Sequence, residues 1–507
     1  MGYLELIVGA LTVALTTWIW SFLVSFAWRP YLKAKRLREQ GVGGPKGSFW
    51  SGCADEINHM KAACGDMVFD INSHDYLNKI FPHYIKWSSQ YGGTFIYSIG
   101  EKTRLFISDP ELIKEVLSNK FGFYMKLDPG AGITALLGKG LVLTDGEQWT
   151  RHKRVVNPAF TMERIKTMTR TMADCAKSML DQWQDKKEVE VGMYLQELTA
   201  DVISHTAFGS SYSAGKEVFL AQKELIMIVL ASFLKLEFPI KKYLPTENNK
   251  HRWKLEKKLR GTLMSIIENR LASKEKGYGN DLLGLMMEAC NTGNQGETNL
   301  SIDEIIDECK TFYFAGHETT SHLLTWTMFL LSTHQDWQER LREEVLSECG
   351  KQIPDPDKIT KFKLMTMVIF EVLRLYSPVS VIARTARKDI KLGNLMIPKG
   401  MDIIIPIAII HHSKELWGPD ANEFNPLRFE NGVSKAAKHP NAMMAFSIGP
   451  RACVGQNFAL TEAKTVLCMI LQRFSFTISP DYKHMPADRI TLQPQKGLPI
   501  VLTPLEA

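Results

Sequence analysis

The chain has 507 residues, of which 45% are hydrophobic and 23% are charged, so its composition is that of a folded protein and excludes global disorder. The formal net charge of +6 is small for this length and gives no reason to expect nucleic-acid binding. The eight cysteines are scattered without a CxxC pair. This pattern fits a reducing compartment and argues against a disulfide framework or a structural zinc site.

The first predicted element is an uncharged run, LIVGALTVALTTWIWSFLVSFAW, over residues 6–28. A helix of that length spans roughly 35 Å, which is enough to cross a bilayer. Basic residues follow at once, so the positive-inside rule places the rest of the chain in the cytosol. A cleaved signal peptide would have a basic start and a shorter apolar core. We therefore expect a single-pass membrane anchor over residues 1–28.

The remainder is predicted to be one large domain, mainly α-helical with small β-sheets. Residues 29–50 are a basic linker that contains a Gly/Pro-rich hinge, GVGGPKG, and the domain follows over residues 51–507. Residues 92–109 alternate between apolar and polar side chains and predict a two-stranded hairpin. Short strands are expected near 380–405 and 489–503, and helical periodicity covers most of the rest.

A long helix is predicted from Ser301, because SIDE at 301–304 has the pattern of a capping box. Apolar and aromatic residues continue to about Ser332, giving about 45 Å of helix. Its middle contains AGHETT at 315–320, where a glycine costs roughly 1 kcal/mol of helix stability relative to alanine. The polar residues of this cluster either face solvent or mark a site that opens to a ligand.

Two further segments carry unusual charges. In LMTMVIFEVLRLYSP (364–378), Glu371 and Arg374 are three positions apart on a helix that is otherwise apolar. Such a pair should be buried, where unpaired charge is expensive, and Arg428 could join it. In FSIGPRACVG (446–455), Cys453 stands between glycines just before an apolar helix. By itself it could be a buried structural cysteine or a thiolate directed at a metal.

These segments together resemble the cytochrome P450 superfamily across essentially the whole chain. AGHETT, the ExxR pair, PLRF at 426–429 and FxxGxRxCxG occur in the family's order. Three other segments are similar to plant microsomal members of clan seventy-two: SNKFGFYMK (118–126), GKGLVLTDGEQWTRHKRVVNPAF (138–160) and TLQPQKGLP (491–499). The resemblance implies the cytochrome P450 fold, preceded by one transmembrane helix in the endoplasmic reticulum membrane.

The resemblance also implies heme b as the cofactor, with Cys453 as the axial ligand of the iron. Phe446 begins this loop, Gly449 would permit a tight turn, and Gly455 would let the following helix approach the porphyrin. Other residues would contact the heme propionates, namely Arg451, Arg384, Trp149 and Lys153, the last two in a WxxxR motif that ends here in lysine. Glu371, Arg374 and Arg428 would form a structural triad.

The implied activity is that of a monooxygenase that uses O₂ and electrons from NADPH, delivered by NADPH–cytochrome reductase. Gly316 would leave a groove for dioxygen, and Thr319 and Glu318 would relay protons. A basic face for the reductase could come from Arg151, His152, Lys153, Arg154, Lys257 and Lys258, unless these residues are ordinary solvated surface. The substrate would be an apolar small molecule such as a terpenoid, plant hormone or fatty acid. By the family pattern the pocket would be lined by Ile133, Leu136, Leu137, Phe312, Phe314, Val379, Val381, Ile382 and Leu498.

Two alternatives remain at this point. An isomerase or dehydratase of the same fold would need neither O₂ nor a reductase, and it would usually lack the Glu318–Thr319 arrangement. A heme-binding protein without turnover would keep Cys453 and dispense with the proton relay. Consumption of NADPH in the presence of a reductase distinguishes both alternatives from a monooxygenase.

Overall fold

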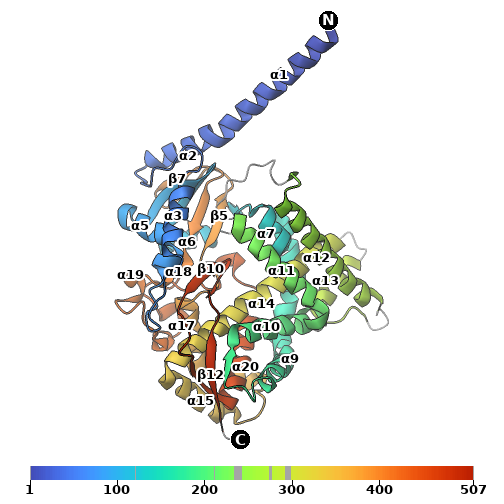
Figure 1. Ribbon diagram of the computed structural model, residues 1–507, viewed down its shortest axis with the longest axis vertical. Coiled ribbons are helices and arrows are strands. Elements are labelled where there is room, and N and C mark those ends of the chain that lie inside the picture. Colours follow the sequence, from blue (N-terminus) through green and yellow to red (C-terminus); the bar gives the residue numbers. More distant parts are fainter. Residues whose placement is uncertain are drawn as a thin grey trace.

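A computed structural model describes residues 2–119, 121–210, 212–232, 243–272, 277–291 and 299–505. Over these ranges the chain is mainly helical, and its small sheets lie beside the helices (Figure 1). This confirms the mainly α-helical fold with small β-sheets that the sequence predicts.

The first group of helices lies between Gly2 and Asn291 in the chain. They are α1 (Gly2–Leu23), η1 (Val24–Trp28), α2 (Arg29–Arg38), α3 (Ala54–Cys64), α4 (Leu77–Ile80), α5 (Pro82–Tyr91), α6 (Pro110–Leu117) and α7 (Gly130–Leu137). They continue with α8 (Gly146–Val156), η2 (Asn157–Phe160), α9 (Met162–Asp181), α10 (Val191–Phe208), α11 (Tyr212–Ser232), α12 (Glu247–Ala272) and α13 (Leu282–Asn291).

The second group of helices lies between Ile302 and Arg473 in the chain. They are α14 (Ile302–Thr333), α15 (Gln335–Cys349), α16 (Pro356–Ile359), α17 (Lys363–Leu375), α18 (Ile407–His411) and α19 (Lys414–Trp417). After three short turns, η5 (Pro426–Phe429), η6 (Val433–Lys435) and η7 (Gly449–Arg451), the last helix is α20 (Gln456–Arg473).

The strands form four small sheets within the described residues. The largest has the order β1-β2-β8-β5-β3 and joins β1 (Thr94–Ile99), β2 (Lys102–Ile107), β3 (Tyr124–Lys126), β5 (Ile382–Ala386) and β8 (Asp402–Ile405). The others pair β4 (Glu188–Glu190), β12 (Pro499–Pro504) and β9 (Phe474–Ile478); β10 (Pro486–Arg489) and β11 (Thr491–Pro494); and β6 (Ile390–Leu392) and β7 (Leu395–Ile397). The predicted hairpin is β1–β2, in which Thr94 pairs with Ile107.

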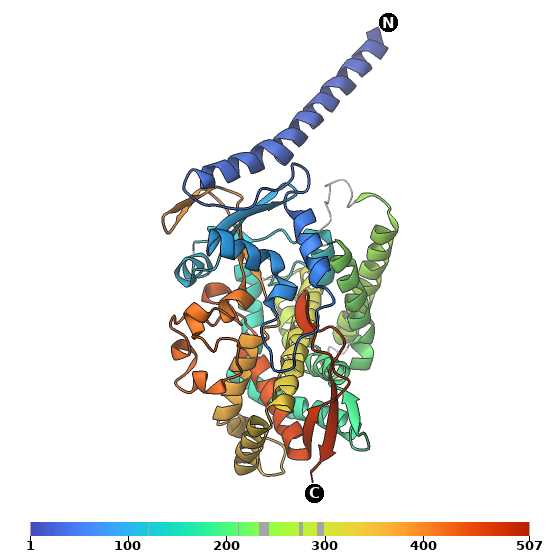
Figure 2. The ribbon, with the colours of Figure 1, turned by 60° about the vertical axis from the view of Figure 1, so that its left-hand side comes forward.

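Helix α14 crosses the helical body (Figures 1 and 2). Its N-terminus has the predicted capping box, since the Ser301 hydroxyl accepts from the backbone N–H of Glu304 and the Glu304 carboxylate accepts from that of Ser301. Glu318 and Thr320 in its middle are buried, at 6% and 2% exposure. The solvent-facing alternative for the AGHETT cluster is therefore wrong.

The N-terminal helix α1 extends away from the rest of the chain in both views (Figures 1 and 2). Many of its apolar side chains are exposed, including Leu6 at 71% and Trp20 at 70%. Among the residues that the structure describes, no helix meets the combined length and apolarity needed for a membrane span.

The segment that the sequence predicts as a hinge lies against β1. The backbone N–H of Ile96 donates to the carbonyl of Gly43 at 2.9 Å. A Cβ atom on Gly44 would lie 1.9 Å from the carbonyl oxygen of Ile96, so the glycine allows the two backbones to approach each other. Residues 43–52 are thus packed onto the sheet.

Candidate active site

A buried ion pair on α17 organises the region around Cys453. Both side chains of the pair, Glu371 and Arg374, are fully buried. Arg374 Nε donates to Glu371 Oε2 and Arg374 Nη2 donates to Glu371 Oε1, each at 2.7 Å. This bidentate contact pairs the planar guanidinium with the carboxylate and uses two of the five N–H groups of Arg374.

The remaining guanidinium donors bind backbone carbonyls in the segment that follows β8, from the end of α18 to Glu423. Arg374 Nη1 donates to the carbonyls of His411 and Ala421, and Nη2 also donates to that of Glu423. Arg428 completes the predicted triad, because its Nε lies 3.4 Å from Glu371 Oε1. Every donor of Arg374 has an acceptor, which is the condition for keeping such a charge in the interior.

One residue of this stretch connects the triad to the cysteine loop. His411 accepts from Arg374 through its carbonyl, and its Nε2 accepts from the backbone N–H of Met444 at 2.9 Å. The loop then turns back on itself, since the N–H of Cys453 donates to the carbonyl of Phe446 at 2.9 Å. Burial and the nearby Arg374 charge lower the pKa of His411 to about 3, so the imidazole stays neutral and can accept this hydrogen bond.

Gly449 makes the cysteine loop possible. Its φ of +76° lies in the left-handed region that favours glycine, and a Cβ atom there would lie 2.5 Å from the carbonyl oxygen of Leu117. The loop ends at Gly455, the N-cap of α20, and Cys453 stands two residues before it. The tight turn predicted at Gly449 is present.

The Cys453 side chain faces a cavity of about 310 Å³ between α14, β5 and the cysteine loop. Burial raises the pKa of its thiol, and the backbone N–H of Gly455 acts in the opposite direction by hydrogen bonding to the sulfur. The protein surroundings therefore favour the neutral thiol on balance, and a bound cation would be needed to hold a thiolate there.

A cluster of cations surrounds one end of this cavity. Lys126 on β3 is the cross-strand neighbour of Arg384 on β5. Lys126 and Arg451 both line the cavity. Asp145 contacts Arg451 and accepts from the backbone N–H of Lys126 at 2.8 Å. Burial, together with Arg384 and Arg451, lowers the pKa of Lys126 to about 7. Three cations around one carboxylate form a site for a further anion.

Trp149 and Lys153 of α8 close the same end. The Lys153 ammonium donates to the carbonyl of Pro450 at 2.8 Å and lies 4.8 Å from the centre of the Trp149 ring. The Arg451 guanidinium also lies over that ring, at 4.2 Å. Trp149 and Lys153 both line the cavity, as does Arg451. The structure therefore brings together three of the residues that the family resemblance assigns to the heme propionates.

Comparison with known proteins gives the same family for the chain. The family model described as cytochrome P450 matches residues 68–501. The chain belongs to the cytochrome P450 family. It is 50% identical to cytochrome P450 709B1 of Arabidopsis thaliana, with 99% of each chain covered. It is 43% identical to cytochrome P450 CYP72A616 of Paris polyphylla, over 96% of this chain and 95% of that protein, which supports the predicted similarity to clan seventy-two.

The family implies a monooxygenase with a heme whose iron is bound by a cysteine thiolate. The residues present fit this cofactor. Cys453 supplies a sulfur that faces the cavity, and the three cations among its lining residues, Lys126, Lys153 and Arg451, suit the two carboxylates of a heme. The predicted propionate contact Arg384 is buried next to Lys126 on the neighbouring strand and is not among the lining residues. Gly455 also lines the cavity, where a side chain would narrow the approach to the sulfur.

Lys126 is a site residue that the sequence analysis does not identify. It lies within the SNKFGFYMK segment that carries the family resemblance, but no motif marks it. Its role depends on the pairing of β3 with β5, which places it opposite Arg384, more than two hundred positions later in the chain. The sequence feature that could have identified Lys126 is its position as a charged residue at the end of the short strand β3.

The two predicted proton-relay residues of α14 lie in different environments. Thr319 lines the cavity, and its hydroxyl donates to the carbonyl of Ala315 at 2.8 Å. Glu318 is not among the lining residues; it accepts from the Thr491 hydroxyl at 3.1 Å and lies 3.8 Å from the ring of His322. Of the two predicted relay residues, Thr319 therefore lines the cavity and Glu318 lies behind it in the described structure.

Gly316 also lines the cavity, and the packing of α10 against α14 gives a second reason for a glycine at this position. A Cβ atom there would lie 2.7 Å from Cδ1 of Ile203 on α10. The glycine therefore lets α10 pack closely against α14, in addition to any space that it leaves for dioxygen.

The residues predicted to line a substrate pocket fall into two groups. Phe312, Val379 and Ile382 line the cavity. The other predicted wall residues do not line it: Ile133, Leu136, Leu137, Phe314, Val381 and Leu498. Leu136 and Leu498 are fully buried and belong to the hydrophobic core, because α7 and β12 pack against other helices and strands there. Ile203 of α10 is a lining residue that the sequence analysis misses, because only the α10–α14 packing reveals it.

The predicted basic face is wrong at His152. This residue is fully buried: its Nδ1 contacts the Glu308 carboxylate and its Nε2 lies 3.4 Å from Glu304 Oε1. Burial lowers the pKa of His152, but the hydrogen bonds and charges of the two glutamates outweigh this and raise it overall. Lys153 is half-buried and lines the cavity.

Replacing Arg374 with lysine should destabilise the protein by about 3–5 kcal/mol, the cost of breaking a buried charge pair. A lysine offers one ammonium in place of the fork that binds Glu371, His411, Ala421 and Glu423. Denaturant unfolding and heme content measure the effect. Arg170→Lys, in an exposed pair with Asp174, is the matched control and should change stability by less than about 0.5 kcal/mol. Equal losses in the two variants would contradict the assignment.

Lys126→Met should weaken heme retention by removing one of three cations at the cavity rim while preserving the length and the apolar stem of the side chain. Heme loss to an excess of apomyoglobin measures retention directly, without enzyme turnover. Lys139→Met is the control, since Lys139 is exposed and does not line the cavity. The role of Lys126 is excluded if both variants release heme at the rate of the unmodified protein.

Proposed function

We propose that the protein hydroxylates an apolar small molecule, using O₂ and electrons that NADPH supplies through a cytochrome reductase. The observation that carries this proposal is the cavity beside Cys453, which has cations at one end and apolar side chains at the other. Apart from Lys126, Lys153 and Arg451, its lining residues are uncharged. Pockets of this kind orient apolar ligands through a small number of polar groups.

The residues divide into binding and reaction roles. Heme, when bound, activates dioxygen, and thiolate donation from Cys453 favours cleavage of the O–O bond. Arg451, Lys126, Lys153 and Trp149 would hold the propionate end, and Arg384 lies next to Lys126 across the sheet. Phe312, Val379 and Ile382 exclude water and position the substrate by contact with its apolar surface. The resemblance to clan seventy-two points to terpenoids, plant hormones and fatty acids as the first substrates to examine.

The experiment that tests this function uses membranes containing the protein and a plant NADPH–cytochrome reductase. We expect O₂-dependent consumption of NADPH and an oxygenated product from at least one member of an apolar panel. Cys453→Ala should abolish both the product and the thiolate-type Soret band of the reduced carbon-monoxide complex. Product formation without O₂ or NADPH would instead favour an isomerase or a dehydratase. Heme binding without any turnover would favour a non-catalytic protein.

Thr319 is proposed to pass protons to the oxygen-binding side of the cavity. Its hydroxyl lines the cavity and is held by the Ala315 carbonyl, so it can accept a proton from a water molecule and donate its own. Glu318 would supply such protons indirectly, since its carboxylate is hydrogen-bonded to Thr491.

Thr319→Ala should lower the yield of product per NADPH consumed and raise the release of hydrogen peroxide, with heme content unchanged. The effect should fall within about 10²-fold, the lower range for one acid–base group. Thr325→Ala is a matched control: Thr325 makes the same type of hydrogen bond on α14, to the Ser321 carbonyl, but does not line the cavity. An unchanged product-to-peroxide ratio in Thr319→Ala would exclude this role.

We further propose that residues 1–28 attach the protein to a membrane. The support is the uncharged run of the sequence and the exposed apolar side chains of α1. Deleting residues 1–28 should move much of the protein from the membrane pellet to the supernatant. The carbon-monoxide difference spectrum should persist, because the cavity residues lie beyond this segment. A truncated protein that remains fully in the pellet would contradict the attachment.

A further inference from the structure

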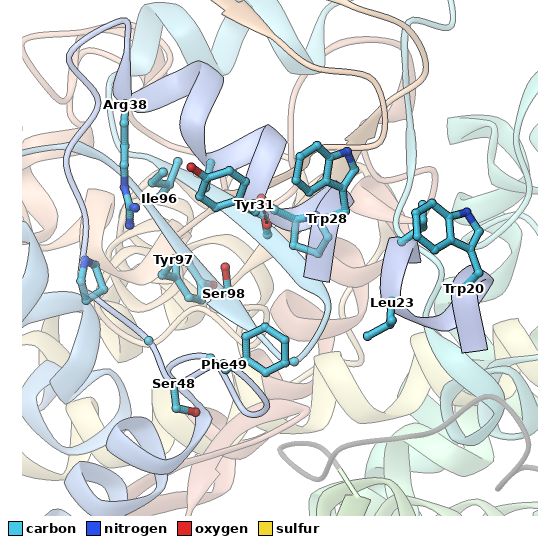
Figure 3. A pocket seen from close by; sticks show the side chains of 18 residues that line it. Trp20, Leu23, Trp28, Tyr31, Arg38, Ser48, Phe49, Ile96, Tyr97 and Ser98 are labelled. Atoms are coloured by element: carbon cyan, nitrogen blue, oxygen red, sulfur yellow. Dashed lines mark hydrogen bonds between the residues drawn. The ribbon is translucent and has the colours of Figure 1, made fainter. Parts of the chain in front are cut away.

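A second cavity, of about 900 Å³, lies between the N-terminal helices and the β1–β2 hairpin (Figure 3). We call it the N-terminal groove. Its walls come from three segments: residues 20–38, residues 45–52 and residues 96–103. It shares no lining residue with the Cys453 cavity, so it is a separate site. Its volume is within the range of ligand sites, roughly 300–1,000 Å³.

The mouth of the groove is aromatic and exposed. Trp20, Trp28, Tyr31 and Phe49 line it and are 70%, 58%, 56% and 66% exposed. In Figure 3 the rings of Trp28 and Phe49 lie on opposite sides of the opening. Apolar surface of this extent marks an interaction site, and indole and phenol rings favour the interfacial region of a membrane.

The wall that carries Phe49 is held rigidly. Residues 48 and 52 exchange two backbone hydrogen bonds, at 2.8 and 3.0 Å, and the N–H of Cys53 donates to the carbonyl of Ser98 at 2.7 Å. Gly52 has a φ of +61°, and a Cβ atom there would lie 2.4 Å from the Ser98 oxygen. The turn is thus fixed against β1, which keeps Phe49 at the rim of the groove.

Arg38 is the one charged residue among the described lining residues, and it reaches into the groove from α2 (Figure 3). Neighbouring basic side chains are engaged elsewhere: Arg36 pairs with Asp389 at 3.3 Å, and the Lys33 ammonium donates to the Gly400 carbonyl at 2.6 Å. A guanidinium at the end of an apolar groove suits a ligand with a hydrocarbon chain and a phosphate.

We propose that the N-terminal groove binds one anionic phospholipid, with an acyl chain between the aromatic walls and the phosphate at Arg38. The inference rests on the membrane attachment proposed above and adds a defined lipid site to it. The groove is continuous with the exposed apolar surface of α1, so a lipid beside that helix has direct access to it. The enzyme's own apolar substrate is the competing occupant, and it would not require the Arg38 charge.

The test uses the full chain in phosphatidylcholine vesicles that contain phosphatidylglycerol with a photoreactive diazirine at the end of one acyl chain. After illumination, mass spectrometry locates the adducts. We expect adducts in residues 45–52 and 96–103 as well as in α1. Ser98→Trp would fill the groove and should remove the first two sets while leaving those in α1. Adducts confined to α1, or adducts that persist in Ser98→Trp, would overturn the proposal.

The head-group contact is tested separately. Arg38→Gln should lower labelling of the groove by the phosphatidylglycerol probe about fivefold, the contribution of one basic residue at an anionic lipid surface. Arg36→Gln is the matched control on the same helix and should leave labelling unchanged. The proposal would be overturned if Arg38→Gln and Arg36→Gln reduced labelling equally. It would also be overturned if a zwitterionic probe labelled the groove as strongly as the phosphatidylglycerol probe and its labelling did not depend on Arg38. The carbon-monoxide spectrum of each variant verifies that it is folded. If the protein proved to have no monooxygenase activity but the groove were still labelled, the proposed function would fail and the lipid site would be retained.

Discussion

The cysteine loop of this protein depends on the burial of one guanidinium. Arg374 is fully buried, and its five N–H groups all donate, two to Glu371 and the others to backbone carbonyls between residues 411 and 423. Removing such a charge from water costs several kcal/mol, and the hydrogen bonds to the surrounding acceptors must offset this cost. In the observed conformation of residues 411–423 every N–H group of Arg374 has an acceptor, and the same conformation places His411 beside Met444 of the cysteine loop.

From His411 the constraint reaches the sulfur through the backbone. Met444 is held by the imidazole Nε2, and two residues later the Phe446 carbonyl accepts from the N–H of Cys453. Gly449 supplies the left-handed turn between them. The position of the sulfur is thus determined by α17 and the segment after β8, which lie outside the ten-residue motif that contains it.

The sequence could predict this part of the site because its signals are local. Glu371 and Arg374 interrupt an apolar helix, and Cys453 lies in a glycine-rich turn before another helix. Lys126 and Ile203 were missed because their roles arise from pairing between distant segments: β3 with β5 for Lys126, and α10 with α14 for Ile203. His152 was misassigned for the same reason, since the glutamates that hold it inside the protein are on α14.

The electrostatics of the cavity explain why the fold and the cofactor belong together. At one end, burial and the neighbouring Arg384 and Arg451 charges lower the pKa of Lys126 to about 7. At the other, burial raises the pKa of the Cys453 thiol, because a thiolate is less well solvated there than in water. A ligand with two carboxylates and a central metal cation would place negative charge beside the cations and positive charge beside the sulfur. Binding energy from these contacts adds to the stability of the native state, so cofactor binding and folding of the loop are thermodynamically linked.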